Sequence, residues 1–255
     1  MVDLAPQASG IAVGRRDPDV WWIVSDEPGP SAVLAVDRSG SQLGAVTMEG
    51  IDGVNVEDIA VGPCDAADTT PCIFVAEIGD NVAGRNDIMI HRFPEPTPQT
   101  ASTAVSTATL QYPDGAVDAE ALIVDQTGVP LILTKETGIS RVFAPTAFAD
   151  GLLSLVTTLT IPPPDAPLLT SVVGLNITGA DLSPDGQRVL LRTYDSVVEL
   201  TAPAGAPQLT GLADWAAEEL PAPFEPQGEA VAYLPDGRSF VTVSEGSGAI
   251  WTLQR

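Results

Sequence analysis

The sequence predicts an all-β protein, most simply a five-bladed β-propeller, and three observations carry this prediction. Short runs rich in Val, Ile, Leu and Thr recur along the chain, bounded by turn signals such as PDG, SG, TG and GD. Strongly amphipathic helical patterns are scarce, and 23 Gly and 23 Pro residues are scattered throughout. A polar residue followed by an apolar strand returns five times, which the main alternative, a β-sandwich, does not explain.

Each repeat opens with a polar residue, a small or acidic residue and then an apolar strand. The five opening residues are Ser9, Glu57, Glu120, Thr178 and Glu229, in the segments SGIAVG, EDIAVGP, EALIVDQTG, TGADLSPDG and EAVAYLPDG. They follow one another at intervals of about 48 to 63 residues, close to the length of a four-stranded propeller blade. The spacing predicts five blades, with six as the alternative.

Each opening is followed by a second and often a third strand. The second strands are predicted in VWWIVSDE, CIFVAEIGDN, LILTKET, VLLRTYD and FVTVSEGS, and the third in SAVLAVD, DIMIHRF, SRVFAP, VVELTAP and AIWTLQR. The last repeat has room for three strands, so the N-terminal MVDLAPQ is expected to supply its fourth and close the ring. Residues 94–106 and 201–227 are interpreted as outer strands and loops, with a short helix at 212–220. The whole chain, 1–255, is then one domain.

The charge balance excludes several classes of partner. Eleven basic residues against 34 acidic ones give a formal net charge of −23, the opposite of a nucleic-acid-binding footprint. The same sign disfavours anionic membrane surfaces. No apolar run reaches the roughly 18 residues of a membrane span. The start MVDLAPQASG lacks the basic and apolar regions of a signal peptide, so the sequence is either cytoplasmic or a mature chain without its leader.

The two cysteines favour the second interpretation. Cys64 and Cys72 lie close together in GPCDAADTTPC, between two strand-like runs. A disulfide there would close a short loop and stabilise the fold by roughly 2–3 kcal/mol. Two free thiols are the alternative. A disulfide predicts a secreted or cell-surface protein, because such bonds persist in oxidising compartments.

The repeated acids predict a site in the central channel. The first strand of each blade lines the channel of a propeller, so the five opening residues converge in space. Three ionised glutamates at ~5 Å would repel by on the order of 3 kcal/mol per pair at an effective dielectric constant near 20. A bound cation, buried basic partners or a protonated carboxyl group must therefore offset the repulsion.

The sequence offers residues for two of these solutions. Lys135 and Arg192, at the ends of second strands, could reach neighbouring glutamates. A hard cation such as Ca²⁺ would suit an all-oxygen site. Its predicted ligands are Glu57, Glu120, Glu229 and Asp80, with Thr178 and Asn81 adding neutral oxygens. The structural alternative is that the repeated acids form ion pairs between blades or bind backbone amides of the next blade, as we expect for Asp58.

The loop EIGDNVAGR, residues 77–85, is the least ordinary of the turns. Asp80 and Asn81 end an apolar strand, level with Lys135, Arg192 and Glu245 of other blades. Such a turn is as compatible with structure as with function. By contrast, Asp185 and Asp236 in SPDG and LPDG fit turn chemistry alone.

Taken in order, these motifs resemble a known family. EDIAVGP, IGDN with Arg85, YPDG–AEAL, the TK pair, TGADLSPDG with LRTY, and QGEAVAY with SEGS span roughly residues 55–250. They resemble a largely uncharacterised family of secreted bacterial β-propellers, and more distantly the calcium-bearing phytase-like and gluconolactonase-like propellers. That distant resemblance implies a central metal and, in some members, hydrolysis of esters, lactones or phosphoesters. Two departures weaken the implied reaction: the blade count is five, and few basic residues are available to bind phosphate.

Several kinds of catalytic or binding site are disfavoured because the sequence lacks the residues that they need. His91 is the only histidine and lies in a predicted third strand, and no G-x-S-x-G elbow is present, so a Ser-His-Asp hydrolase is not indicated. The same shortage disfavours a His/Cys zinc site. Neither GxGxxG nor a P-loop occurs. A glycosidase could use Glu57, Glu120 and Glu229 as its carboxylates, but aromatic residues for a sugar platform are only 5% of the chain.

Two function classes therefore remain. The first choice is a ligand- or partner-binding module with an acidic, calcium-binding channel. The alternative is a metal-dependent hydrolase of esters, lactones or phosphoesters, with Lys135, Arg192 or Glu245 as candidate catalytic residues. The expected partner is a small molecule or a protein, and the chain is expected to be a monomer.

Overall fold

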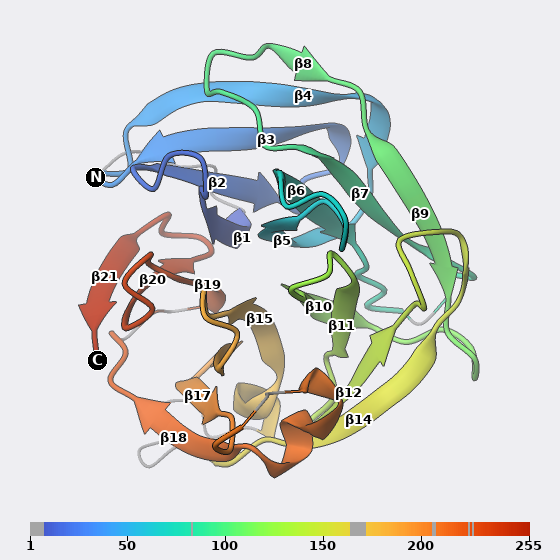
Figure 1. The fold of residues 1–255 in the computed structure, drawn as a ribbon, viewed down its shortest axis with the longest axis vertical. Coiled ribbons are helices and arrows are strands. Elements are labelled where there is room, and N and C mark those ends of the chain that lie inside the picture. The colour runs from blue at the N-terminus through green and yellow to red at the C-terminus, as the bar shows by residue number, and fades with distance from the viewer. Residues whose placement is uncertain (1–7, 83, 164–171, 206–207, 224, 226) are drawn as a thin grey trace.

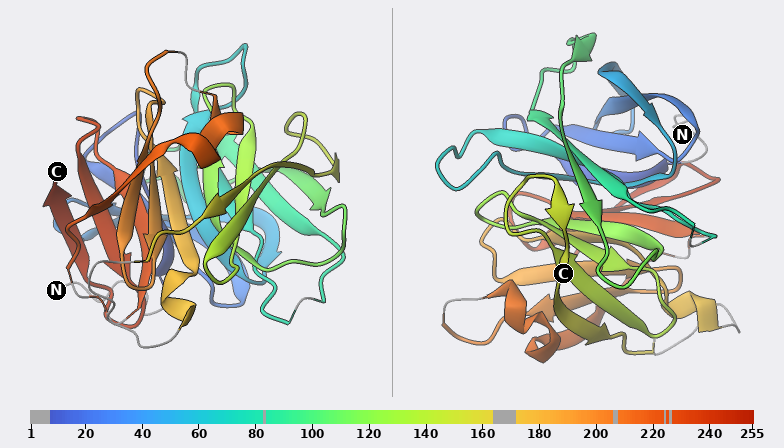
Figure 2. Two further views of the ribbon diagram at one scale, coloured as in Figure 1. Left: turned by 90° about the horizontal axis from the view of Figure 1, so that it is seen from below. Right: turned by 90° about the vertical axis from the view of Figure 1, so that its right-hand side faces the viewer.

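The five predicted blades are present in the computed structural model, which describes residues 8–82, 84–163, 172–205, 208–223, 225 and 227–255. The sheets are arranged radially, with one strand of each next to the centre (Figure 1). Seen from the side, these inner strands run from one face of the molecule to the other (Figure 2). The predicted all-β propeller with five blades is thus confirmed.

The inner strands match the five predicted openings. They are β1 (Ala8–Val13), β5 (Val56–Pro63), β10 (Ala119–Val124), β15 (Ile177–Leu182) and β19 (Gly228–Tyr233). The second strands are β2 (Val20–Ser25), β6 (Pro71–Glu77), β11 (Pro130–Thr134), β16 (Arg188–Thr193) and β20 (Ser239–Ser244). The third strands are β3 (Gly29–Asp37), β7 (Ile88–Pro94), β12 (Ile139–Ala144), β17 (Val197–Thr201) and β21 (Ile250–Gln254). All three pair antiparallel within each blade.

The outer strands complete four of the blades. They are β4 (Gln42–Gly53), β9 (Ser106–Gln111), β14 (Ser154–Thr160) and β18 (Ala216–Leu220). Two short strands, β8 (Ser102–Thr103) and β13 (Gly151–Leu152), add parallel to β4 and β9 and so tie neighbouring blades at the rim. The fifth blade has three strands among the described residues. The segment expected to supply its fourth, residues 1–7, lies outside the described part.

The helix expected at 212–220 is wrong. A short 3-10 helix, η2, covers Leu209–Asp214, and residues 216–220 form β18, which pairs with β17 as the fourth strand of its blade. Pairing with an otherwise open strand edge outweighs the helix propensity of Ala and Glu. A second 3-10 helix, η1, covers Val172–Leu175. No helix among the described residues is both long and apolar enough to cross a bilayer.

The hydrophobic core lies between the blades. Each of five apolar clusters joins two adjacent sheets; one contains Trp22 of β2 and Phe93 of β7, and another contains Phe74 of β6 and Phe143 of β12. The cluster between the fifth and first blades, with Trp21 and Val241, closes the ring by packing. The inner strands are therefore fixed relative to one another, which positions the residues at the two ends of the channel.

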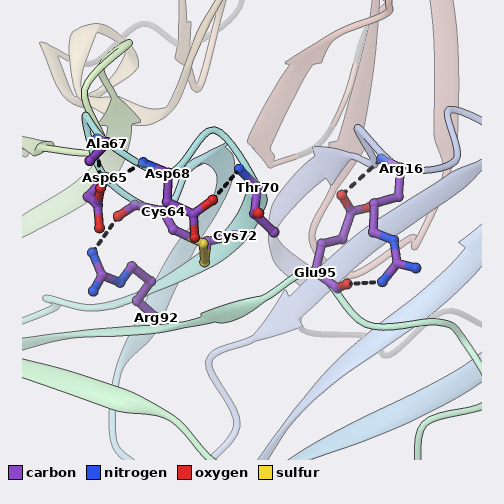
Figure 3. Close-up of a disulfide and its surroundings, with 9 residues drawn as sticks. All are labelled: Arg16, Cys64, Asp65, Ala67, Asp68, Thr70, Cys72, Arg92 and Glu95. Atoms are coloured by element: carbon purple, nitrogen blue, oxygen red, sulfur yellow. Dashed lines mark hydrogen bonds between the residues drawn. A yellow bond between two sulfur atoms is a disulfide. The ribbon is translucent and has the colours of Figure 1, made fainter.

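The predicted disulfide between Cys64 and Cys72 is confirmed. It spans eight residues at the hairpin between β5 and β6 (Figure 3). Within the closed loop, Asp65 Oδ1 accepts hydrogen bonds from the N–H groups of Ala67 and Asp68, at 2.8 and 2.9 Å. Arg92 donates to the carbonyl of Cys64 and lies 4.0 Å from the centroid of the Phe148 ring. The bridge therefore belongs to a packed corner of the fold.

Candidate functional site

A β-bulge marks the opening residue of every inner strand. The pairing register between the first and second strands shifts once in each blade, and the shift brackets Ser9, Glu57, Glu120, Thr178 and Glu229 in turn. A bulged residue leaves the strand ladder, and its side chain is redirected. This repeated irregularity frees the opening side chains from the sheet faces at one end of the channel.

Four of the five opening residues meet in one cavity, which we call the acidic mouth. It has a volume of about 240 Å³ and is lined by Ser9, Asp26, Glu57, Asn81, Glu120, Lys135, Tyr194, Gln227, Glu229 and Glu245. The lining combines the starts of inner strands with residues that directly follow second strands. Five carboxyl groups face one ammonium there, so the cavity is strongly acidic.

Lys135 is the only lysine of the chain, and it forms an ion pair with Glu120. Its Nζ also lies 5.3 Å from the centroid of the Tyr194 ring, within the range of a cation–π contact. Burial disfavours the charged form of Lys135, but Glu120 and Tyr194 together outweigh it and raise the pKa of Lys135. Lys135 is therefore a cation at neutral pH and is not poised to act as a nucleophile.

The Gln227 side chain bridges two further carboxyl groups. Its Nε2 donates to Glu229 Oε1 at 2.7 Å and also to Glu245. Burial raises the pKa of Glu229 to about 10, with the neighbouring charge of Glu120 adding to the rise. Burial also raises the pKa of Glu245. This side of the acidic mouth therefore retains protons that free carboxyl groups would lose.

The Glu57 carboxylate lies next to Gly79, in the loop of residues 77–85. Burial raises its pKa to about 8, and the negative charges of Glu120 and Asp26 add to the effect. Burial raises the pKa of Glu120 to about 7, although Lys135 opposes the rise. Among the described residues, neither Glu57 nor Glu229 forms an ion pair with a basic side chain. The acidic mouth thus holds two carboxyl groups that Lys135 influences through its charge but does not contact in an ion pair.

We expect Gly79→Ala to displace Glu57, because a Cβ at residue 79 would overlap its carboxylate and come within 2.8 Å of Asn55 Cβ. The free energy of unfolding should fall by about 1–3 kcal/mol, as for other overpacked sites. Urea denaturation measures the change. Gly84→Ala in the same loop is the control, since its nearest contact would be an ordinary 3.8 Å to Val82. Equal effects of both substitutions would contradict the assigned role of Gly79.

Three predicted site residues are not part of the acidic mouth. Asp80 is buried and accepts hydrogen bonds from the N–H groups of Gly84 and Arg85, at 3.0 and 2.8 Å, so it shapes its own loop. Thr178 donates to the Gly228 carbonyl at 2.8 Å. Arg192 pairs with Glu225 at 2.7 Å. Each of these side chains therefore has a hydrogen-bond or ion-pair partner outside the acidic mouth.

Side chains of the inner strands also tie adjacent blades together. Ser9 donates to the Val56 carbonyl at 2.9 Å, as Thr178 does to the fifth blade. Asp58 Oδ2 accepts from Leu122 N–H at 2.8 Å, which confirms the expected anchoring of the next blade. Burial raises the pKa of Asp58 despite these bonds. The two adjacent acids therefore have different roles. Glu57 lines the channel, and Asp58 connects its blade to the next one.

Sequence reasoning missed Asp26, Tyr194 and Gln227. A signal for the first two was present in the second strands, where VSD, LTK, RTY and VSE align. In each, a Ser or Thr pairs with the start of the inner strand, and the next residue lines the acidic mouth. By this alignment Tyr194, not Arg192, is the counterpart of Lys135. No repeated pattern in the sequence pointed to Gln227.

His91, the single histidine of the sequence, belongs to a buried hydrogen-bond and ion-pair network in the second blade. Its ring nitrogens lie 3.2 Å from Glu77 Oε2 and 2.9 Å from Thr107 Oγ1, and Glu77 also pairs with Arg85 at 3.1 Å. This position on β7 agrees with the structural role expected from the sequence. In this blade Glu77 takes the place of the Ser or Thr that ends the other second strands.

The carboxyl groups are chemically suited to a hard cation, but their arrangement is not that of a ready metal centre. Within the part of the chain that the structure describes, no group of three or more His, Cys, Asp or Glu side chains is placed to hold a metal ion. The ammonium of Lys135 already pairs with Glu120. Ca²⁺ binding would therefore require the side chains to rearrange.

Comparisons with known proteins support the architecture. No protein-family model matches the chain, and no curated protein matches it. The PQQ-bound form of an aldose sugar dehydrogenase from Streptomyces coelicolor is 11% identical, with a TM-score of 0.53 over 97% of this chain and 94% of that one. A chain of the nidogen/laminin complex is 10% identical, with a TM-score of 0.50 over 97% and 75%. At such identities these likenesses show the propeller fold alone.

Proposed function

We propose that this protein is a ligand-binding module whose acidic mouth binds a small, positively charged ligand. The observation that carries the proposal is the presence of Glu57 and Glu229, two buried carboxyl groups without an ion-pair partner among the described residues. Buried carboxylates are costly unless they are paired or neutralised. A cationic ligand would stabilise the ionised form of these two groups, so its binding would release the protons that burial makes them keep.

An organic ammonium ion is the ligand that best suits this cavity. The contacts of Lys135 provide a template: a carboxylate on one side and the Tyr194 ring on the other. The remaining lining offers hydrogen-bond acceptors in Glu57, Glu229 and the side-chain amide of Asn81. An ammonium group donates in several directions and does not require the strict ligand geometry of a metal.

Ca²⁺ is the second candidate. An all-oxygen lining of carboxylates and amides favours it over softer metals. A metal-dependent hydrolase, the alternative function, would rest on the same carboxyl groups, but Lys135 is engaged and Arg192 lies outside the acidic mouth. The disulfide fits an oxidising compartment, so secretion or cell-surface attachment is part of the proposal.

The test is thermal unfolding with n-butylammonium, with Ca²⁺, and with a chelator. A ligand held at ~100 times its dissociation constant stabilises the folded state by about 2.7 kcal/mol, which raises the Tm by several degrees. We expect n-butylammonium to raise the Tm of the wild type and to lose this effect in Glu57→Gln and Glu229→Gln. Lys135→Ala, which vacates the template position, should bind n-butylammonium more tightly than the wild type.

The matched control is Asp214→Asn, which removes one negative charge at an exposed residue of η2. It should respond to n-butylammonium as the wild type does. A calcium response that Glu57→Gln abolishes would assign the site to Ca²⁺ instead. If neither cation changes the Tm of any variant, the acidic mouth is not a cation site.

A further inference from the structure

A second cavity lies at the other end of the channel, where the inner strands finish. It has a volume of about 270 Å³ and is lined by Ala12, Val13, Gly14, Arg15, Pro18, Val61, Asp181, Leu182, Pro184, Tyr233 and Pro235. We call it the opposite mouth. Its walls are mostly apolar, with Val61, Leu182 and three prolines, whereas the acidic mouth is almost entirely polar. The two ends of one channel therefore differ in chemistry.

Arg15 is the basic residue of this cavity. Within the described ranges, its guanidinium makes no hydrogen bond and no ion pair, although Asp181 and Glu95 lie near enough to interact electrostatically. Burial lowers the pKa of Arg15, because neighbouring atoms partly remove water from the charged group. An arginine remains charged even so. The cavity thus presents a partly desolvated cation with five N–H donors to spare.

The neighbouring Arg16 shows the contrast. Its Nη1 donates to the carbonyl of Glu95 at 2.8 Å, so its guanidinium serves the structure (Figure 3). Asp181 does not need Arg15 as a partner either. Its two carboxyl oxygens accept hydrogen bonds from the N–H groups of Leu182 and Tyr233, at 2.9 and 2.7 Å. Arg15 is therefore available to a ligand.

The backbone that carries Arg15 is held rigidly. The buried Glu95 accepts hydrogen bonds from the N–H groups of Arg15 and Arg16, at 3.1 and 3.0 Å, and from the Trp22 indole at 3.1 Å. Gly14 packs so tightly that a Cβ there would lie 2.6 Å from the Asp17 carbonyl oxygen. A fixed backbone lowers the entropy lost when a ligand binds.

We propose that the opposite mouth is a second binding site, for a small organic monocarboxylate with an apolar body. The carboxylate would bind the Arg15 guanidinium, whose planar fork suits two parallel hydrogen bonds. The apolar body would pack against Val61, Leu182 and Pro184. A monoanion is favoured over a dianion because Asp181 and the net charge of −23 repel additional negative charge. This site is independent of the acidic mouth.

The test uses benzoate as the probe, titrated calorimetrically, with benzamide as its uncharged counterpart. Benzoate should bind the wild type and benzamide should not. Arg15→Gln should weaken benzoate binding by at least about tenfold, since hydrogen bonds to charged groups contribute more than neutral ones. Arg238→Gln is the matched control: it removes an exposed arginine from the turn next to Pro235, outside the lining.

Three outcomes would overturn the proposal. The first is the absence of benzoate binding to the wild type. The second is unchanged benzoate affinity in Arg15→Gln, provided that the Tm of this variant shows that it is folded. The third is displacement of benzoate by inorganic phosphate at equal concentration, which would indicate a general anion site without a role for the apolar wall. Backbone amide shifts at Val61 and Leu182 on adding benzoate would place the bound probe.

Discussion

Replacing Glu225 with glutamine should lower the free energy of unfolding by about 3–5 kcal/mol, as expected when one partner of a buried ion pair is removed. The side chains of Arg192 and Glu225 are each 1% exposed, and Arg192 Nη2 lies 2.7 Å from Glu225 Oε2. Thr242 Oγ1 donates to the second carboxylate oxygen at 2.9 Å. The substitution would leave the buried Arg192 charge without its ion-pair partner, and the Nε and Nη1 groups of Arg192 make no hydrogen bond among the described residues.

Urea denaturation of a small set of variants tests this interpretation. The double variant Arg192→Met/Glu225→Leu should recover much of the loss, because apolar side chains avoid the cost of burying charge. Asp19→Asn breaks the exposed pair with Arg38 and should cost at most about 1 kcal/mol. If Glu225→Gln unfolds at the wild-type urea concentration, the buried pair does not contribute to the free energy of unfolding as expected.

The fold was predictable because its signal is repeated. One polar opening could be chance, but five at blade-length intervals are difficult to explain by another architecture. The same repetition predicted that Glu57, Glu120 and Glu229 would approach one another, and all three line the acidic mouth. The disulfide was equally predictable, since the two cysteines are separated by only eight positions and allow a single pairing.

The partners of the charged residues were less predictable, because they depend on strand register. Arg192 and Lys135 both lie at the ends of second strands. Arg192 is paired with Gly179 of β15 and so remains within the sheet, whereas Lys135 lies one residue beyond the end of β11. A shift of one residue reverses the face on which a side chain lies. Glu225 lies in a connecting segment with no repeat, so nothing in the sequence identified it as the partner of Arg192. The strand at 216–220 was missed for a similar reason, since only its pairing with β17 defines it.

Raising the pH should destabilise the protein, and the acidic mouth is the cause. The folded-state pKa values of Glu120, Glu57 and Glu229 are raised to about 7, 8 and 10, whereas the unfolded chain loses these protons near 4.5. Between pH 5 and those values the folded state retains protons that the unfolded state has lost. For each such proton, the free energy of unfolding falls by about 1.4 kcal/mol per pH unit. Urea denaturation at several pH values from 5 to 9 measures the slope.

Glu229→Gln should therefore stabilise the protein at pH 8, while it abolishes cation binding. The glutamine keeps the shape of the protonated side chain and removes the cost of protonating it, so a gain above about 1.4 kcal/mol, the equivalent of one pKa unit, is expected. The slope of stability against pH should become shallower by about one proton. Asp214→Asn, the exposed control, should leave the slope unchanged.

The opposite result is equally informative. If Glu229→Gln is less stable than the wild type at pH 8, then Glu229 is ionised and supported by its hydrogen bond from Gln227. The acidic mouth would then be a self-sufficient structural network. If the variant gains stability and loses the ligand response together, the wild type sacrifices stability to keep unpaired carboxyl groups in place, as functional sites commonly do. That combination would separate a binding site from a structural ring of acids more directly than either measurement alone.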